Sequence, residues 1–158
     1  PRLSTSENAV SSSFVHYLGG NSRLGGSVLI GESPQKRRTL VGAHGVLTLA
    51  KDWLAEFELD RELSYLSSNA TDEIETVASF MKFGNYAFKG FLWYFIFEHM
   101  SQNSEAGGFS GSQSPGLGIQ WLPFPHFDVQ IEYQRTVFNS APGNVNHTGF
   151  VMFHMYPF

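Results

Sequence analysis

Apolar and polar residues alternate along most of this chain, and the alternation is clearest between residues 127 and 138. There, Phe127, Val129, Ile131, Tyr133 and Val137 fall on one face, and Asp128, Gln130, Glu132, Gln134 and Thr136 fall on the other. A period of two predicts a half-buried β-strand. The segment 53–65 repeats the pattern, with Trp53, Ala55, Phe57, Leu59, Leu63 and Tyr65 opposite a polar set that includes Glu56, Glu58, Asp60 and Glu62. A helix would wrap those acids around its surface, so a strand is favoured here too.

Weaker alternation predicts further strands over 11–18, 24–30, 41–49, 77–83, 91–100, 117–122 and 150–158, which gives about eight or nine strands without an intervening helix. Short turns are expected at 19–21, 51–52, 85–89 and 123–126. Longer polar loops are expected at 32–38, 67–75, 102–115 and 139–148. This order predicts an antiparallel meander with one trimmed end and one elaborated end. Outer-membrane barrels have that asymmetry, and soluble lipocalin-like barrels can show it as well.

Composition narrows the class of protein. No apolar run reaches the ~18 residues that a membrane-spanning helix needs. The net charge of −4 and the absence of a basic cluster beyond Lys36-Arg37-Arg38 argue against nucleic-acid binding. The chain has no cysteine, which excludes disulfides, thiolate metal sites and c-type haem attachment within it. We therefore predict no cofactor and no metal site.

The end of the sequence carries a family resemblance. Phe150, Met152, His154 and Tyr156 share one face, and the sequence finishes on Phe158. This ending resembles the terminal, barrel-closing strand of bacterial outer-membrane β-barrels, and the block 121–135 looks like the turn–strand units near the end of porin-like proteins. The resemblance implies an all-β, antiparallel transmembrane β-barrel in a bacterial outer membrane. It would act as a porin-like channel or as a structural sheath for a partner in a membrane complex, in contact with outer-membrane lipid and lipopolysaccharide.

The number of strands raises a question of completeness. Single-chain bacterial barrels have an even number of strands with both ends inside the cell envelope, whereas nine strands would leave residues 1–9 as an external or disordered stretch. Either 11–18 is not a spanning strand, or residues 1–158 are the C-terminal part of a larger barrel. The second interpretation is favoured, with Phe158 closing against a strand outside this sequence. The partners would then be other envelope proteins or an N-terminal barrel portion.

Charged residues mark the candidate sites. The acidic residues on polar strand faces would line the lumen as an ion pathway or grip a cargo; they are Glu56, Glu58, Asp60, Glu62, Glu98, Asp128 and Glu132. Alternatively, they pair with Lys or Arg on neighbouring strands. Arg61 and Arg135 lie on apolar faces and are expected to contact lipid headgroups, or simply to snorkel at the interface. Aromatics at strand ends are expected to form an interfacial girdle, namely Tyr17, Trp53, Tyr86, Trp121, Phe127 and Tyr156.

Two alternatives to a passive barrel stay open, although we expect no enzymatic activity. His99-Met100-Ser101 resembles the His-x-Ser pair of outer-membrane lipid A deacylases, in which a histidine base activates a serine. A third, orienting carboxylate cannot be assigned, and the pair lies far from the C-terminus, unlike that family's motif. The other alternative is a soluble, lipocalin-like ligand-binding barrel.

Overall fold

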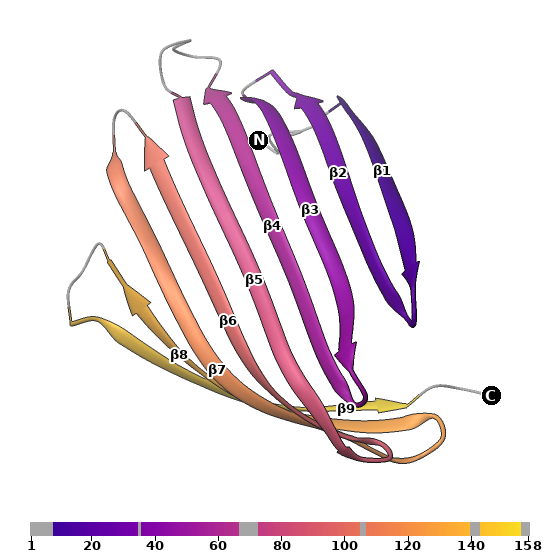
Figure 1. Cartoon of the computed structure of the whole chain (residues 1–158). Coiled ribbons are helices and arrows are strands. Elements are labelled where there is room, and N and C mark those ends of the chain that lie inside the picture. The colour runs from indigo at the N-terminus through magenta and orange to yellow at the C-terminus, as the bar shows by residue number, and fades with distance from the viewer. Residues whose placement is uncertain (1–7, 35, 67–72, 105–106, 140–142, 156–158) are drawn as a thin grey trace.

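A computed structural model of the chain describes residues 8–34, 36–66, 73–104, 107–139 and 143–155. These residues form one antiparallel sheet of nine strands, ordered as in the sequence (Figure 1). The strands are β1 (Asn8–Gly19), β2 (Ser22–Glu32), β3 (Lys36–Ala50), β4 (Trp53–Leu66), β5 (Glu73–Phe88), β6 (Phe91–Ser104), β7 (Gly108–Phe124), β8 (Phe127–Phe138) and β9 (Val145–Met155). The expected all-β class and antiparallel meander are confirmed. No helix long and apolar enough to cross a membrane occurs in the described part of the chain.

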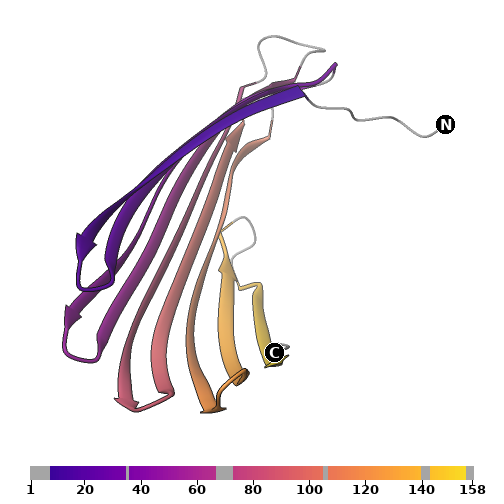
Figure 2. The ribbon, with the colours of Figure 1, turned by 90° about the vertical axis from the view of Figure 1, so that its right-hand side faces the viewer.

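The sheet is a single curved layer with a concave and a convex face (Figures 1 and 2). Strand register places the even-numbered residues of β4 to β8 on one face and the odd-numbered residues on the other. On β6 the even-numbered Leu92, Tyr94 and Ile96 are buried, whereas Trp93 and Phe95 are exposed. Side chains converge on the inner side of a curved sheet, so the buried set marks the concave face.

Large apolar side chains dominate the exposed convex face. Exposed members of this set include Leu59, Met81, Leu117, Ile131 and Phe153, the last of them 64% exposed. The core of buried apolar residues is small by comparison, and consists of Leu92, Tyr94 and Ile96 with Leu54 and Phe80 packed against it. A water-soluble sheet normally buries its apolar face and exposes its polar face. Here the arrangement is reversed.

Four tight turns form one end of the sheet. Each leaves two residues between strands, after Gly19, Ala50, Phe88 and Phe124. Asn21, Asp52 and His126 occupy the left-handed region there, with φ of 66°, 73° and 66°. The register shifts next to all four turns, as expected where a type I turn ends in a left-handed residue and forms a bulge. All four short turns fall at one common end, which we call the turn end. The turn predicted at 85–89 lies later than expected, at Lys89 and Gly90, because residues 85–88 belong to β5.

At the opposite end, the loop end, the strands run further than the sequence predicted. Gly108 to Pro115 was expected to be loop, but it belongs to β7 and pairs with β6 as far as Ser104. The start of β3 at Lys36, of β5 at Glu73 and of β9 at Val145 also fall inside predicted loops. Backbone pairing with the neighbouring strand maintains these polar extensions, which carry too few apolar side chains to be recognised by alternation.

The two outermost strands are unpaired on one side. β1 pairs with β2 and β9 pairs with β8, and no contact joins β1 to β9 in the described residues. The sheet is therefore open there, and closure into a barrel is not observed. An external or disordered stretch was predicted over residues 1–9, but Asn8 and Ala9 belong to β1. Residues 1–7 lie outside the described residues.

Candidate functional site

Register brings the predicted acidic residues to the concave face. Glu56, Glu58, Asp60 and Glu62 alternate along β4 with the convex-face residues of that strand. Glu58 is opposite Phe80 on β5, which is opposite Glu98 on β6, so two carboxylates share one row across three strands. The sheet thus gathers acids from separate parts of the sequence on its inner side.

Basic side chains neutralise the two ends of the β4 stripe. Lys36 Nζ lies 2.7 Å from Glu62 Oε1, and an Arg38 nitrogen lies 3.7 Å from the other oxygen of that carboxylate. At the opposite end, Lys82 Nζ lies 3.7 Å from Glu56 Oε2. The alternative prediction, that the acids pair with Lys or Arg on neighbouring strands, therefore holds for Glu56 and Glu62, the first and last acids of the stripe.

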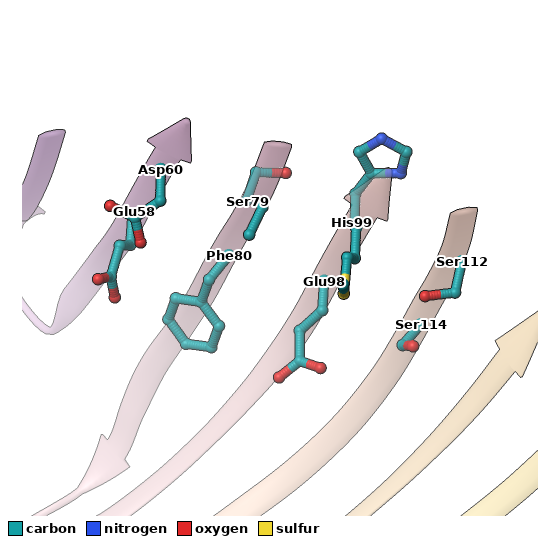
Figure 3. A pocket seen from close by; sticks show the side chains of 10 residues that line it. Glu58, Asp60, Ser79, Phe80, Glu98, His99, Ser112 and Ser114 are labelled. Atoms are coloured by element: carbon teal, nitrogen blue, oxygen red, sulfur yellow. The ribbon is translucent and has the colours of Figure 1, made fainter. Parts of the chain in front are cut away.

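The middle of the stripe differs from its ends. In the described part of the chain, Glu58, Asp60 and Glu98 have no ion pair and no side-chain hydrogen bond. They line a hollow of about 370 Å³ on the concave face, shown in Figure 3. The rest of its lining comes from Ala78, Phe80, Met100, Ser112 and Ser114 on the same face, and from Ser79 and His99, whose register positions belong to the convex face. Unpaired carboxylates along such a wall concentrate cations from water.

Asp128 and Glu132 behave differently from those three acids. Glu132 is 5% exposed, and its carboxylate accepts hydrogen bonds from Tyr94 at 2.8 Å and from Gln134 at 3.1 Å. Asp128 is 3% exposed, and its Oδ1 lies 2.9 Å from His154 Nδ1. Both acids belong to the predicted lumen set by position. Their burial and hydrogen bonds indicate a structural role for both carboxylates.

Sequence reasoning did not single out Tyr94 or its neighbours. Tyr94 is 1% exposed, accepts a hydrogen bond of 2.9 Å from Gln130 Nε2, and carries Lys82 Nζ 4.4 Å above its ring centre. It therefore links the Lys82–Glu56 pair on β5 and β4 to Glu132 on β8. Tyr94 and Glu98 are four residues apart on one strand, so the sequence places them on the same face. It cannot show which side chains of other strands lie next to Tyr94.

Arg61 and Arg135 lie on the convex face, as predicted from the apolar phase of their strands. The Arg61 side chain is 60% exposed, and its Nε donates a hydrogen bond of 2.7 Å to Glu75 Oε1. Arg135 is exposed and stands opposite His147 on β9. Contact with lipid headgroups stays a prediction, and for Arg61 it has a competitor in Glu75.

Aromatic side chains cluster near the turn end of the convex face. The ring of Trp53 stacks on Phe83 with centroids 5.0 Å apart and meets Trp93 edge-on at 5.8 Å. Phe127 lies 6.5 Å from Phe153 by the same measure. Two expected members of the girdle lie on the other face. Tyr17 is opposite Arg23 and Tyr86 is opposite Leu92, so register assigns both to the concave side. Tyr156 lies outside the described residues.

In the predicted closing strand, the residues that were expected to share one face do so, but that face is the concave one. Phe150, Met152 and His154 stand opposite Glu132, Gln130 and Asp128, on the concave face. The convex face of β9 consists instead of the residues between and beyond them, including Val151, Phe153 and Met155, which are exposed. The last strand is apolar on both faces, so alternation alone could not tell which face looks outward. Tyr156 and Phe158 lie outside the described residues.

The His99–Ser101 alternative gains no geometric support. Both residues lie on the convex face of β6, and no hydrogen bond joins their side chains within the described part of the chain. Figure 3 shows the His99 ring directed away from the Glu98 carboxylate, which belongs to the opposite face. The described residues contain no group of three or more His, Asp or Glu side chains that could hold a metal ion.

Comparison with known proteins identifies the fold. No protein family and no curated protein matches the sequence. The loop-L8 deletion mutant of OmpT, an outer membrane protein of Vibrio cholerae, matches with a TM-score of 0.78 and 12% identity over 95% of this chain and 54% of that chain. OmpT folded in vitro gives 0.76 and 11% over 95% and 55%. A bacterial polysaccharide outer membrane secretin gives 0.58 and 12% over 96% and 56%.

These matches establish the fold alone, because all three identities are low. The chain spans about half the length of the structures it matches. Each of those structures is an outer membrane protein, which supports the expected location in a bacterial outer membrane. The nine strands have the fold of an outer-membrane β-barrel wall.

Proposed function

We propose that the chain forms part of the wall of a porin-like channel in a bacterial outer membrane, with its concave face lining a water-filled, cation-favouring pathway. The observation that carries the proposal is the set of unpaired carboxylates of Glu58, Asp60 and Glu98 around one concave hollow.

The distribution of polarity supports this orientation. The convex face carries exposed apolar side chains such as Leu59, Leu117 and Ile131, which suit contact with lipid hydrocarbon. A lipocalin-like soluble barrel would need the opposite arrangement, with apolar side chains inside and polar ones outside. The structure therefore gives the soluble alternative no support.

The distribution of charge supports ion selectivity. Side chains two residues apart on one face of a strand are separated by ~7 Å. Glu58 and Asp60 stand at that spacing, and neither forms an ion pair with a described Lys or Arg side chain. Glu98 adds a third carboxylate two strands away. A wall with this excess of negative charge attracts cations and repels anions. The ion pairs at the ends of the stripe confine the excess to its middle.

Conductance across a planar bilayer tests the proposal, using protein purified from the outer membranes of cells that make it. Under a salt gradient, the reversal potential should show a preference for cations. The triple variant Glu58→Gln, Asp60→Asn, Glu98→Gln should move that potential towards the value of an unselective pore. Glu32→Gln and Glu73→Gln are the matched controls, because both acids are exposed and lie on the convex side by register.

The same measurement addresses the sheath interpretation. Protein that inserts into the bilayer but passes no ions would contradict the channel. That result would favour a structural sheath whose concave face holds a partner. Equal shifts in the concave-face variant and the convex-face controls would remove the three acids as the source of selectivity.

A further inference from the structure

An apolar strip runs through the middle of the concave hollow. It consists of Phe80 and Ala78 on β5 and of Met100, which register places next to Ala78 on β6. Met100 is 49% exposed, whereas the apolar core residues on the same face of β6 are at most 5% exposed. An inorganic ion gains nothing from exposed hydrocarbon in a channel wall. A solute with hydrocarbon of its own does gain, because contact removes apolar surface of both from water.

Carboxylates flank this strip on two sides. Figure 3 shows the Phe80 ring between the carboxylates of Glu58 and Glu98. These acids belong to β4 and β6, whose backbones are two strand spacings or ~10 Å apart. Asp60 lies beside Glu58 on the β4 side. Among the described residues that line the hollow, none is Lys or Arg. The lining therefore suits a solute with positive charge at both ends, and it repels a solute that carries a carboxylate.

The separation of the acids argues against a single bound metal ion. Mg²⁺ and Ca²⁺ need several oxygen ligands at about 2.0–2.6 Å from one point. Within the described ranges, no group of three or more His, Asp or Glu side chains converges in this way. Charges that are themselves separated by a chain match the two sides of the strip better. The face of the Phe80 ring adds a further attraction for an ammonium group.

We propose that the hollow binds linear aliphatic diamines and polyamines, which carry ammonium groups at both ends of a methylene chain. One ammonium group would bind Glu98, the other would bind Glu58 and Asp60, and the methylene chain would lie against Phe80 and Met100. The volume of about 370 Å³ is that of a small-molecule site. This inference rests on the proposed function and names the class of solute for which the pathway is selective.

Calorimetric titration of the native protein, purified from outer membranes in detergent, tests the class of ligand. The probe is 1,4-diaminobutane. Mg²⁺ carries the same charge without hydrocarbon, and 1,4-butanediol has the same chain without charge. We expect the diamine to bind at least about tenfold more tightly than either control. Equal affinity for the diamine and for either control would overturn the inference.

Two substitutions test the apolar strip in the same titration. Phe80→Leu removes the ring face, and Met100→Gln replaces an apolar side chain by a polar one of similar length. Each should weaken binding of the diamine about threefold or more and leave that of Mg²⁺ unchanged. Phe80 packs against the core, so the exposed Met100 provides the variant whose folding is not in question. Met152→Gln is the matched control, because Met152 lies on the concave face of β9 outside the hollow.

The variants also define what would overturn the inference. Unchanged affinity of Met100→Gln for the diamine, or an equal loss in Met152→Gln, would show that the strip does not contact the ligand. Failure of this inference differs from failure of the channel. Cation-selective conductance with no preference for the diamine over Mg²⁺ would leave the channel standing and remove the site. Tight, strip-dependent binding of the diamine without conductance would leave the site standing and remove the channel.

Discussion

The hydroxyl of Tyr94 on β6 donates a hydrogen bond of 2.8 Å to Glu132 Oε2 on β8, across the intervening strand. Gly118 of β7 lies between them, because register pairs it with Tyr94 on one side and with Glu132 on the other. The absence of a side chain at Gly118 lets the ring lie over β7. A tyrosine, a glycine and a glutamate in one row thus tie three strands together on the concave face.

Removing the Tyr94 hydroxyl should destabilise the barrel. Tyr94→Phe leaves the buried Glu132 carboxylate without its shortest hydrogen bond. A hydrogen bond to a charged group contributes about 2 kcal/mol. Urea unfolding in detergent, followed by tryptophan fluorescence, should show a loss of that order. Tyr17→Phe is the control, because that side chain is 72% exposed and should give no change. Equal stability of both variants would contradict the account.

Adding a methyl group at Gly118 should disturb the same row. A Cβ there would meet Tyr94 Cζ at 2.3 Å, so the ring must move away from Glu132. Overpacking of this kind costs about 1–3 kcal/mol. Gly149→Ala on β9 is the matched control, since its added Cβ would meet its nearest atom at 3.9 Å. Combining Gly118→Ala with Tyr94→Ala should cost less than the sum of the two single changes; strict additivity would show that the ring and the methyl group do not compete.

Removing Lys82 should change ion selectivity in the opposite direction to removing an acid. Lys82 stands 3.7 Å from Glu56, and its side chain is 16% exposed. Lys82→Met leaves that carboxylate unpaired and makes the net charge of the concave face more negative by one unit. The reversal potential should then indicate a stronger preference for cations. Lys89→Met serves as the control, because Lys89 is exposed in the β5–β6 turn. A weaker preference in Lys82→Met would contradict the assignment of the concave face as the pathway.

The convex-face pair of Arg61 and Glu75 should contribute little to stability. Its atoms are close, but the side chains are 60% and 35% exposed. Exposed pairs contribute about 0–1 kcal/mol, and salt weakens them. A double-mutant cycle with Arg61→Met and Glu75→Gln should give a coupling energy in that range that falls as salt is added. A coupling of several kcal/mol, insensitive to salt, would place the pair within the hydrocarbon layer and contradict its expected position at the level of the lipid headgroups.

Alternation was informative where one face of a strand is consistently polar. For β4 and β8, the face of each residue from Glu56 to Glu62 and from Asp128 to Gln134 follows from period two alone. Alternation failed in two places: at the polar start of β7 and on the apolar last strand, β9. Gly108 to Pro115 is strand although its residues are mostly small and polar, because pairing with β6 holds it. On β9, both faces are apolar, so Phe150 and Met152 gave no sign that they face inward.

Relationships between strands were beyond the sequence. The pairing of Glu62 with Lys36, of Glu56 with Lys82 and of Tyr94 with Glu132 each depends on register, which is set by turn geometry and by the whole sheet. The sequence therefore identified the seven acids but could not separate the three unpaired ones from the four with partners.

The central claim is that the concave face meets water and the convex face meets lipid. Single cysteines along β4 test it most directly, in outer-membrane vesicles treated with a charged, membrane-impermeant maleimide. Glu58→Cys and Asp60→Cys should react, whereas Phe57→Cys and Leu59→Cys should stay unlabelled. Labelling of Phe57→Cys and Leu59→Cys, with protection of the two concave-face positions, would contradict the account.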